Sequence, residues 1–510
     1  MKVKNQRVRK TDDGKQIVWG IVLSYILIIF NAIYGLLITP FIVDKIGVGS
    51  YGVYKTIASL GSSLMIIDLG LGNTIQRYVA KYIADKEDKR KIGNFISMTF
   101  LEGGILSCVA IGVCVAVYFN LDAIFSKGFS SSEIDLAKNM FAILSVTIVA
   151  HIFENILNGV ITGYNKFVVA NGIKLFRLIL RLFFTYVGLI VWKSPILLVS
   201  LDLILVFVLI ICESFYIRFK LNQKLAFISF DVAIFKESIV YSFFMLIASF
   251  VSQINAELGN VFIGAYFGAV EVAIYSTALT IYMMFAQIGS AVSGVMLPKV
   301  TKLLKQENSH IEEYVIKVGR IQFMLIGAAL GAFITLGKPF VAIWMGEEFL
   351  DAYYITIILM IPTIFEICIN VCLAVLRATN KLKFRTVVLV GILVFNVLMA
   401  IFAVPKWGYY TMAIATAFSY FVGHVIIMGF YYKKQFSFSP IRAYGKIFSR
   451  TWICILLSSI GSYIVSFAFQ TNSFKFFFGA VAFVMFYVMM LLIFLPKNEK
   501  QKIYNIIKRR

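Results

Sequence analysis

The chain has 510 residues, of which 60% are hydrophobic and 15% are charged, and its mean hydropathy is +0.86. This composition excludes a soluble globular protein and is typical of an integral membrane protein. A formal net charge of +22 would suggest nucleic-acid binding in a soluble chain. Here the cations lie mainly in loops between apolar spans. We therefore expect them to set the topology and to contact anionic membrane lipids, with no nucleic-acid partner.

About fourteen apolar spans of roughly 20–27 residues follow one another along the chain, each long enough to cross a bilayer as a helix. The first span follows the basic segment 1–16 and is too long for the apolar region of a signal peptide, so we interpret it as a transmembrane helix. The predicted fold class is an all-α integral membrane protein. Its spans are 17–42, 56–76, 93–118, 139–163, 167–192, 195–217, 239–266, 269–296, 320–344, 351–376, 386–405, 409–431, 451–469 and 476–496.

Lysine and arginine are distributed very unevenly between alternate loops. The two termini and the loops on their side carry 37 of these residues, whereas the loops on the other side carry 8. Cytoplasmic loops of membrane proteins are enriched in Lys and Arg. Both termini are therefore predicted to be cytoplasmic, together with the loops at 77–92, 218–236, 299–320 and 433–450.

An internal repeat relates the two halves of the chain. Tyr54, in VGSYGVYKTIASL, aligns with Tyr275, in VEVAIYSTALTI, at an offset of 221 residues. The repeat predicts two pseudo-symmetric six-helix bundles in the same orientation. The predicted parts are 1–220, 221–434, and 435–510, the last holding two extra helices and a basic tail. These two helices carry no buried charge, which favours a peripheral role.

The span 167–192 carries three cations inside an apolar sequence. Lys174, Arg177 and Arg181 are spaced i, i+3, i+7 and therefore lie on one face of a helix. A basic side chain near the middle of a membrane helix costs about 2.5–3.5 kcal/mol. Lys174 is near enough to the cytoplasmic end to snorkel to the headgroups. Arg181 lies roughly 21 Å into the helix, so we expect it to face a polar cavity, with Arg177 beside it.

Two roles are open for the acidic residues inside the spans of the first half. Asp68 and Glu154 either neutralise the arginines as ion pairs or couple transport to protons or ions. His151 is expected to pack with a hydrogen bond. Asp202 and Glu213 lie near span ends, where an interfacial position is expected.

The densest polar run of the second half is 252–260. Glu257 in this run is a further candidate for coupling, and Asn255 is a candidate for lining a cavity. These two side chains cannot share one helix face, so the run lines a cavity only in part. Gln287 is a second cavity-lining candidate, and His424, like His151, is expected to pack with a hydrogen bond.

No sequence motif indicates enzyme chemistry. The chain has no Walker A loop, no GxSxG and no metal-ligand spacing, so we expect no metal, no cofactor and no ATP hydrolysis within this chain. The six cysteines all fall inside apolar runs, where packing is the expected role. The longest predicted external loop, 119–138, holds acids but no clustered partner.

Several segments carry a resemblance to a known family. They are Tyr51-Gly52, DLGLGNTIQRYVAKY at 68–82, FIGAYFGAVEVAIYS at 262–276, LPK at 297–299 and GYYTMAIATAFSY at 408–420. In their order and spacing along the whole chain they resemble the Wzx-type polysaccharide flippases, which serve O-antigen, capsule and teichuronic-like polymers. These belong to the multidrug/oligosaccharidyl-lipid/polysaccharide exporter superfamily.

The resemblance implies an alternating-access transporter of the bacterial cell membrane, inner or plasma, and not an enzyme. The implied substrate is an undecaprenyl-diphosphate-linked oligosaccharide, moved from the cytoplasmic to the outer leaflet for cell-surface polysaccharide biosynthesis. Polysaccharide assembly proteins are further candidate partners. Because arginine suits phosphate oxygens, Lys174, Arg177 and Arg181 become the candidate substrate-binding residues.

Two alternative functions stay open at this point. A cation-coupled multidrug exporter of the same fold would use Asp68, Glu154 or Glu257 as its coupling site, but the cationic stripe argues against it. A membrane glycan polymerase or ligase would be expected to have a large external loop with catalytic side chains, and the external loops carry few cations.

Overall fold

The computed structural model describes residues 2–68, 70–226, 250–294, 311–379, 381–436 and 439–494, and every regular element within these ranges is helical. Contacts between residues divide the chain into two compact units, Met1–Ala273 and Ile274–Arg510. The predicted all-α membrane fold is confirmed. The predicted bundle boundaries at 220 and 434 stay predictions.

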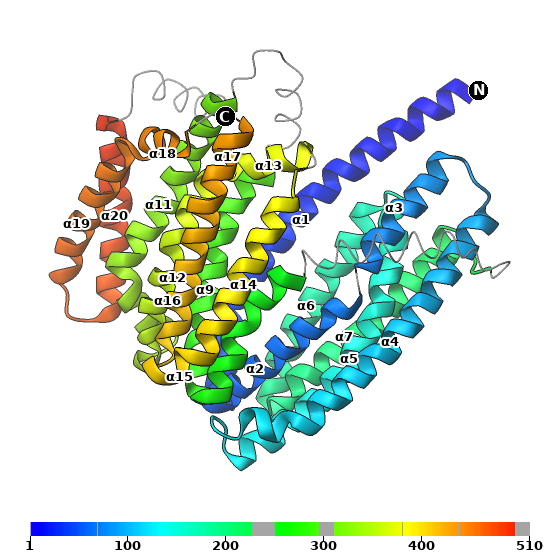
Figure 1. The fold of residues 1–510 in the computed structure, drawn as a ribbon, viewed down its shortest axis with the longest axis horizontal. Helices are drawn as coiled ribbons and strands as arrows, with labels where there is room; N and C mark the ends of the chain where they lie inside the picture. Colours follow the sequence, from blue (N-terminus) through cyan, green and yellow to red (C-terminus); the bar gives the residue numbers. More distant parts are fainter. Residues whose placement is uncertain are drawn as a thin grey trace. The chain divides into compact units, whose positions relative to one another are not determined.

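The N-terminal unit is built around α5, which packs against α2, α3, α4 and α7, while α6 packs against α1 and α7 (Figure 1). The contact between α5 and α3 is close because Gly159 of α5 faces Gly72. A Cβ on Gly159 would lie 2.5 Å from the Gly72 carbonyl oxygen. The helices are α1 Lys2–Ile46, α2 Val48–Leu64, η1 Met65–Asp68, α3 Leu71–Ala84, α4 Lys89–Phe125, α5 Ser131–Gly163, α6 Phe167–Val191, α7 Ile196–Phe215 and η2 Tyr216–Lys220, followed by a helix at 250–266.

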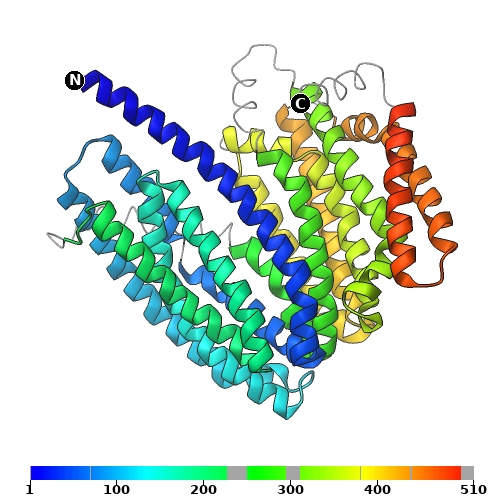
Figure 2. The ribbon, with the colours of Figure 1, turned by 180° about the vertical axis from the view of Figure 1, so that it is seen from behind.

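The C-terminal unit is organised around α11, which contacts α12, α18, α19 and α20. The last two helices pair with each other at one edge of this unit (Figures 1 and 2). Helix α9 begins in the N-terminal unit and continues into this one. The helices are α9 Ala269–Gly294, α11 Ile311–Trp344, η3 Glu347–Phe349, α12 Asp351–Cys368, α13 Val371–Ala378, α14 Lys383–Phe402, α15 Val404–Trp407, α16 Tyr410–Tyr420, η4 Phe421–Ile427, α17 Met428–Phe436, α18 Pro440–Phe448, α19 Thr451–Phe467 and α20 Asn472–Phe494.

The predicted continuous span at 56–76 is wrong, because the α-helix is interrupted inside it. Helix α2 ends at Leu64, and α3 starts only at Leu71. Gly70 between them has φ 68°, a left-handed conformation that glycine adopts without strain. Its N–H donates to Asp68 Oδ1 at 2.9 Å. The turn residues therefore satisfy backbone groups that a break in a membrane helix would otherwise leave unpaired.

Other boundaries also differ from the predicted ones. The span 351–376 splits into α12 and α13, and the span 409–431 contains the π-helix η4. The predicted external loop 119–138 shrinks to residues 126–130, because α4 and α5 extend beyond their apolar sequences. The predicted loop 433–450 contains the short amphipathic helix α18. Hydropathy locates the apolar core of a helix, whereas backbone hydrogen bonding sets its ends.

Ten helices of the described chain are long and apolar enough to cross a membrane, and the bent pair α18–α19 would make an eleventh. Helix α6 is 25 residues long but is not among the ten, because it carries three cations. The total of fourteen spans stays a prediction.

Matching glycines precede the two helices that the repeat relates. Gly47 precedes α2 with φ 81°, and Gly268 precedes α9 with φ 143°. The two glycines are 221 residues apart (268 minus 47), the same offset that aligns Tyr54 with Tyr275. This agreement supports the repeat, and the overlay of the two bundles stays a prediction.

Candidate functional site

Helix α6 carries the three cations on one side of the N-terminal unit. It runs from Phe167 to Val191, as the sequence predicts, and its spacing puts Lys174, Arg177 and Arg181 on one face. The opposite face carries large exposed apolar side chains, among them Phe176, Ile179 and Phe183. The helix is therefore divided into an apolar face and a cationic face, and the question is what each cation contacts.

Arg181 has the closest polar contacts of the three cations. Its Nη2 lies 2.8 Å from Asp202 Oδ2 on α7 and donates to the Tyr54 hydroxyl on α2 at 3.2 Å. The guanidinium also lies over the ring of Tyr34 on α1, 5.5 Å from its centroid. Four helices thus position this one side chain. The Arg181 side chain is 28% exposed, so an ion can still reach it.

Arg177 and Lys174 have weaker contacts. Arg177 Nη2 lies 4.0 Å from Asp202 Oδ1, at the outer limit of an ion pair. Lys174 is exposed and donates to Asn158 Oδ1 on α5 at 3.2 Å. Asn158 in turn donates through Nδ2 to Glu213 Oε1 at 2.9 Å. The cationic face of α6 is therefore lined with side chains of α5 and α7.

The expectation that Asp202 and Glu213 are interfacial is wrong. Asp202 pairs with Arg181, and Glu213 is fully buried with no hydrogen-bond partner for its Oε2. These acids are 11 residues apart on α7, which is about three helical turns, so both lie on one helix face. The shared helix face of the two acids would have predicted their contacts with the polar side of α6 better than their distance from the end of the span.

Asp68 and Glu154 make different contacts from the ion pairs considered in the sequence analysis. Asp68 accepts hydrogen bonds from the Gly70 N–H and from Asn155 Nδ2 at 2.7 Å, so it stabilises the break between α2 and α3. Glu154 Oε2 lies 3.0 Å from His151 Nδ1, one turn earlier on α5. The counter-ion of Arg181 is instead Asp202. The coupling roles of Asp68 and Glu154 stay hypotheses.

The remaining predicted residues are scattered. Asn255 is buried and donates to the Val251 carbonyl at 3.0 Å. Glu257 Oε1 accepts from Gln253 at 3.4 Å. In the C-terminal unit, the buried Oε1 of Gln287 has no hydrogen-bond partner. Asn255 and Glu257 thus hydrogen-bond to residues four positions earlier in the same helix.

A second polar cluster lies inside the C-terminal unit. Glu366 Oε1 of α12 is 3.6 Å from Arg385 Nη2 of α14 and 3.8 Å from His424 Nδ1 of η4. With Asn370 and Tyr432, these side chains line a small pocket. Arg385 lies in the first turn of α14. His424 packs beside the carboxylate of Glu366.

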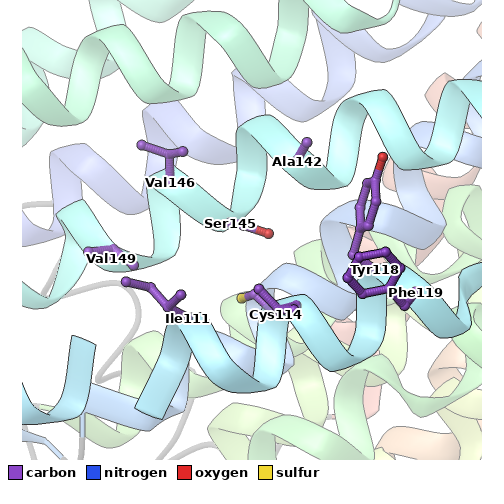
Figure 3. A pocket seen from close by; sticks show the side chains of 9 residues that line it. Ile111, Cys114, Tyr118, Phe119, Ala142, Ser145, Val146 and Val149 are labelled. Carbon is purple, nitrogen blue, oxygen red and sulfur yellow. The ribbon is translucent and has the colours of Figure 1, made fainter. Parts of the chain in front are cut away.

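A separate apolar groove lies between α4 and α5. Its volume is about 490 Å³, and its walls include Ile111 and Val115 of α4 and Val146 and Val149 of α5 (Figure 3). Polar atoms contribute almost nothing to its lining, and the cations of α6 are not among its residues. This groove is not the polar site. No group of acidic, histidine or cysteine side chains in the described part of the chain has the arrangement of a metal site.

The fold of the chain is similar to that of solved membrane transporters. The fold is that of the lipid II flippase MurJ in an inward closed conformation, with a TM-score of 0.73, 17% identity, and coverage of 94% of this chain and 98% of that one. An inward-facing multidrug resistance MATE family transporter matches with a TM-score of 0.61 and 17% identity, over 82% of this chain and 95% of that one.

Residues 17–304 match the family described as "Polysaccharide biosynthesis protein". This match covers more than half of the chain, and the chain belongs to that family. The expectation of a multi-pass membrane transporter and not an enzyme is confirmed by the family and the fold together.

Two curated relatives agree with this assignment. The Staphylococcus aureus capsular polysaccharide biosynthesis protein CapF is 25% identical over 46% of this chain, and the match spans 61% of the relative's length. A putative O-antigen transporter of Shigella flexneri is 22% identical, over 74% of this chain and 88% of the relative.

Proposed function

We propose that the protein is a flippase that moves an undecaprenyl-diphosphate-linked oligosaccharide from the cytoplasmic to the outer leaflet by alternating access. It would serve the biosynthesis of a cell-surface polysaccharide such as a capsule or an O-antigen. The observation that carries this proposal is the cationic face of α6, with Arg181 accessible and held by Tyr54 and Asp202. The family and the flippase fold support the same conclusion.

The chemistry of the cargo fits a cationic site better than an acidic one. A diphosphate carries at least two negative charges, and guanidinium groups bind phosphate oxygens in bidentate geometry. Lys174, Arg177 and Arg181 lie along one helix face, so a phosphate can pass from one cation to the next. If the N-terminus is cytoplasmic, a phosphate entering from that side meets Lys174 first and Arg181 last.

The experiment is complementation of a cell that lacks its own copy, with display of the surface glycan and protein level measured in parallel. Arg181→Ala should abolish display while the protein stays inserted, because the site loses its most fully positioned donor. Arg181→Lys should recover only part of the display, since lysine keeps the charge but loses the planar fork. Arg90→Ala, at an exposed position at the start of α4, is a matched control expected to keep full display.

The proposed topology has both termini in the cytoplasm of a bacterial inner or plasma membrane. Cysteine substitutions labelled with an impermeant reagent in intact cells test this arrangement. A cysteine in the turn 126–130 should react, and Lys305→Cys should not. Position 305 lies outside the described residues. Strong external labelling there would contradict the topology.

A cation-coupled drug exporter is the alternative function for this fold. It would require Asp68, Glu154 or Glu257 to bind the coupling ion. Transport of cationic drugs that survives Arg181→Ala but is lost with Glu154→Gln would favour the exporter over the flippase. Loss of glycan display with Arg181→Ala alone would favour the flippase.

A further inference from the structure

The ion pair between Arg181 and Asp202 is incomplete. Only Nη2 of Arg181 reaches the carboxylate, at 2.8 Å, so the contact is not a bidentate fork. The second carboxylate oxygen, Oδ1, accepts no hydrogen bond and lies 4.0 Å from Arg177. One carboxylate thus stands between two arginines and satisfies only one of them.

Asp68 shows how a structural carboxylate is held in the same unit. It accepts from the Gly70 N–H with one oxygen at 2.9 Å and from Asn155 with the other at 2.7 Å. Both of its oxygens are paired, one with the backbone of the turn at Gly70 and the other with a side chain of α5. Asp202 has one paired oxygen and keeps 19% of its exposure, between two arginines that keep 25% and 28%. Because one of its oxygens is buried without a partner, Asp202 is less completely satisfied than Asp68 and is the weaker competitor for the arginines.

Resting on the flippase proposal above, we propose that Asp202 occupies the anion position of Arg181 when no substrate is bound, and that an incoming diphosphate displaces it. Arg177 and Arg181 are one helical turn apart on one face, so two linked phosphate groups can engage both, which a single carboxylate does not. The divalent ligand therefore outcompetes the monovalent one.

Arg181 keeps its position after the exchange. The Tyr54 hydroxyl and the ring of Tyr34 contact the guanidinium independently of Asp202. The site therefore does not need Asp202 to orient the arginine. In this account Asp202 is a residue that tunes affinity and specificity: it rejects weak monovalent anions and sets how readily the cargo is released.

The test measures binding of inorganic pyrophosphate to the purified full-length protein in a neutral detergent, with inorganic phosphate, which has one phosphate group in place of two, as the comparison. Asp202→Asn should bind pyrophosphate about threefold to tenfold more tightly than wild type, where tenfold corresponds to about 1.4 kcal/mol. It should also bind phosphate more tightly. Asp122→Asn, which breaks the ion pair of 2.6 Å between Asp122 and Lys138 in the same unit, should leave binding unchanged.

A second pair of variants guards against misfolding, since Asp202→Asn leaves the cations without a neighbouring anion. Arg177→Ala combined with Asp202→Asn removes one charge of each sign and should bind pyrophosphate more tightly than Arg177→Ala alone. Unchanged or weaker binding in both comparisons would overturn the exchange and make Asp202 a structural partner. A different pair of results would overturn the flippase proposal itself: wild-type protein that binds no pyrophosphate, and glycan display that Arg181→Ala leaves unchanged.

Discussion

The two units hold their polar clusters in different ways. In the N-terminal unit, Arg177 and Arg181 share the single carboxylate of Asp202, and the helix that carries them is continuous. In the C-terminal unit, Glu366 lies between Arg385 and His424, and the backbone around it is irregular. Helix α12 ends at Cys368, half a turn beyond Glu366, and His424 lies in a π-helix.

The two clusters differ in how far the positive side chains are matched by acidic ones. In the N-terminal cluster two arginines share one carboxylate, so the cluster can accept a further anion. The C-terminal cluster pairs one acid with one arginine and a histidine, so it has no surplus positive charge when the histidine is neutral. Irregular helices at a polar cluster are frequent at places where membrane transporters bend. We therefore assign substrate binding to the first cluster and expect the second to affect shape and stability.

The largest expected effect comes from removing the surplus charge. Arg177→Ala combined with Arg181→Ala should reduce glycan display to the level of cells without the protein, because no guanidinium remains on the face of α6. Arg385→Ala, the matched change in the C-terminal cluster, should retain measurable display. Full display with the double variant would show that the α6 face is not the substrate site.

A smaller effect is expected on stability from the C-terminal cluster. Arg385→Ala leaves Glu366 with His424, at 3.8 Å, as its remaining neighbour within the cluster. The pair is partly exposed and its contact is 3.6 Å, so the loss should be about 1 kcal/mol or less. The measurement is the thermal unfolding midpoint of purified protein. A drop as large as that caused by a core truncation would contradict the assignment.

The smallest effect is expected at Lys174. Its side chain is exposed and makes one hydrogen bond of 3.2 Å to Asn158, so Lys174→Ala should lower display mildly. A long basic side chain near a helix end can reach the headgroups, and its loss then removes little from a site deeper in the membrane. Loss of display as complete as with Arg181→Ala would show that Lys174 is part of the binding site itself.

Much of the fold was readable from the sequence because it depends on local properties. The apolar run of residues 167–192 predicted α6 almost to the residue, since a helix is the structure that satisfies its own backbone in lipid. The same run predicted the cationic face, because a spacing of i, i+3, i+7 places side chains together on any α-helix.

Other features were decided only by the tertiary structure. The partner of Arg181 is Asp202, on the next helix, and not Asp68 or Glu154, because the packing of α6 on α7 decides which acid lies opposite. The break at Gly70 was hidden in an apolar run, since hydropathy does not register a change of backbone conformation. Composition and periodicity determine that a helix forms and which side chains share its face. Which charges meet across helices depends on long-range packing, and in this protein that packing leaves Asp202 between two arginines.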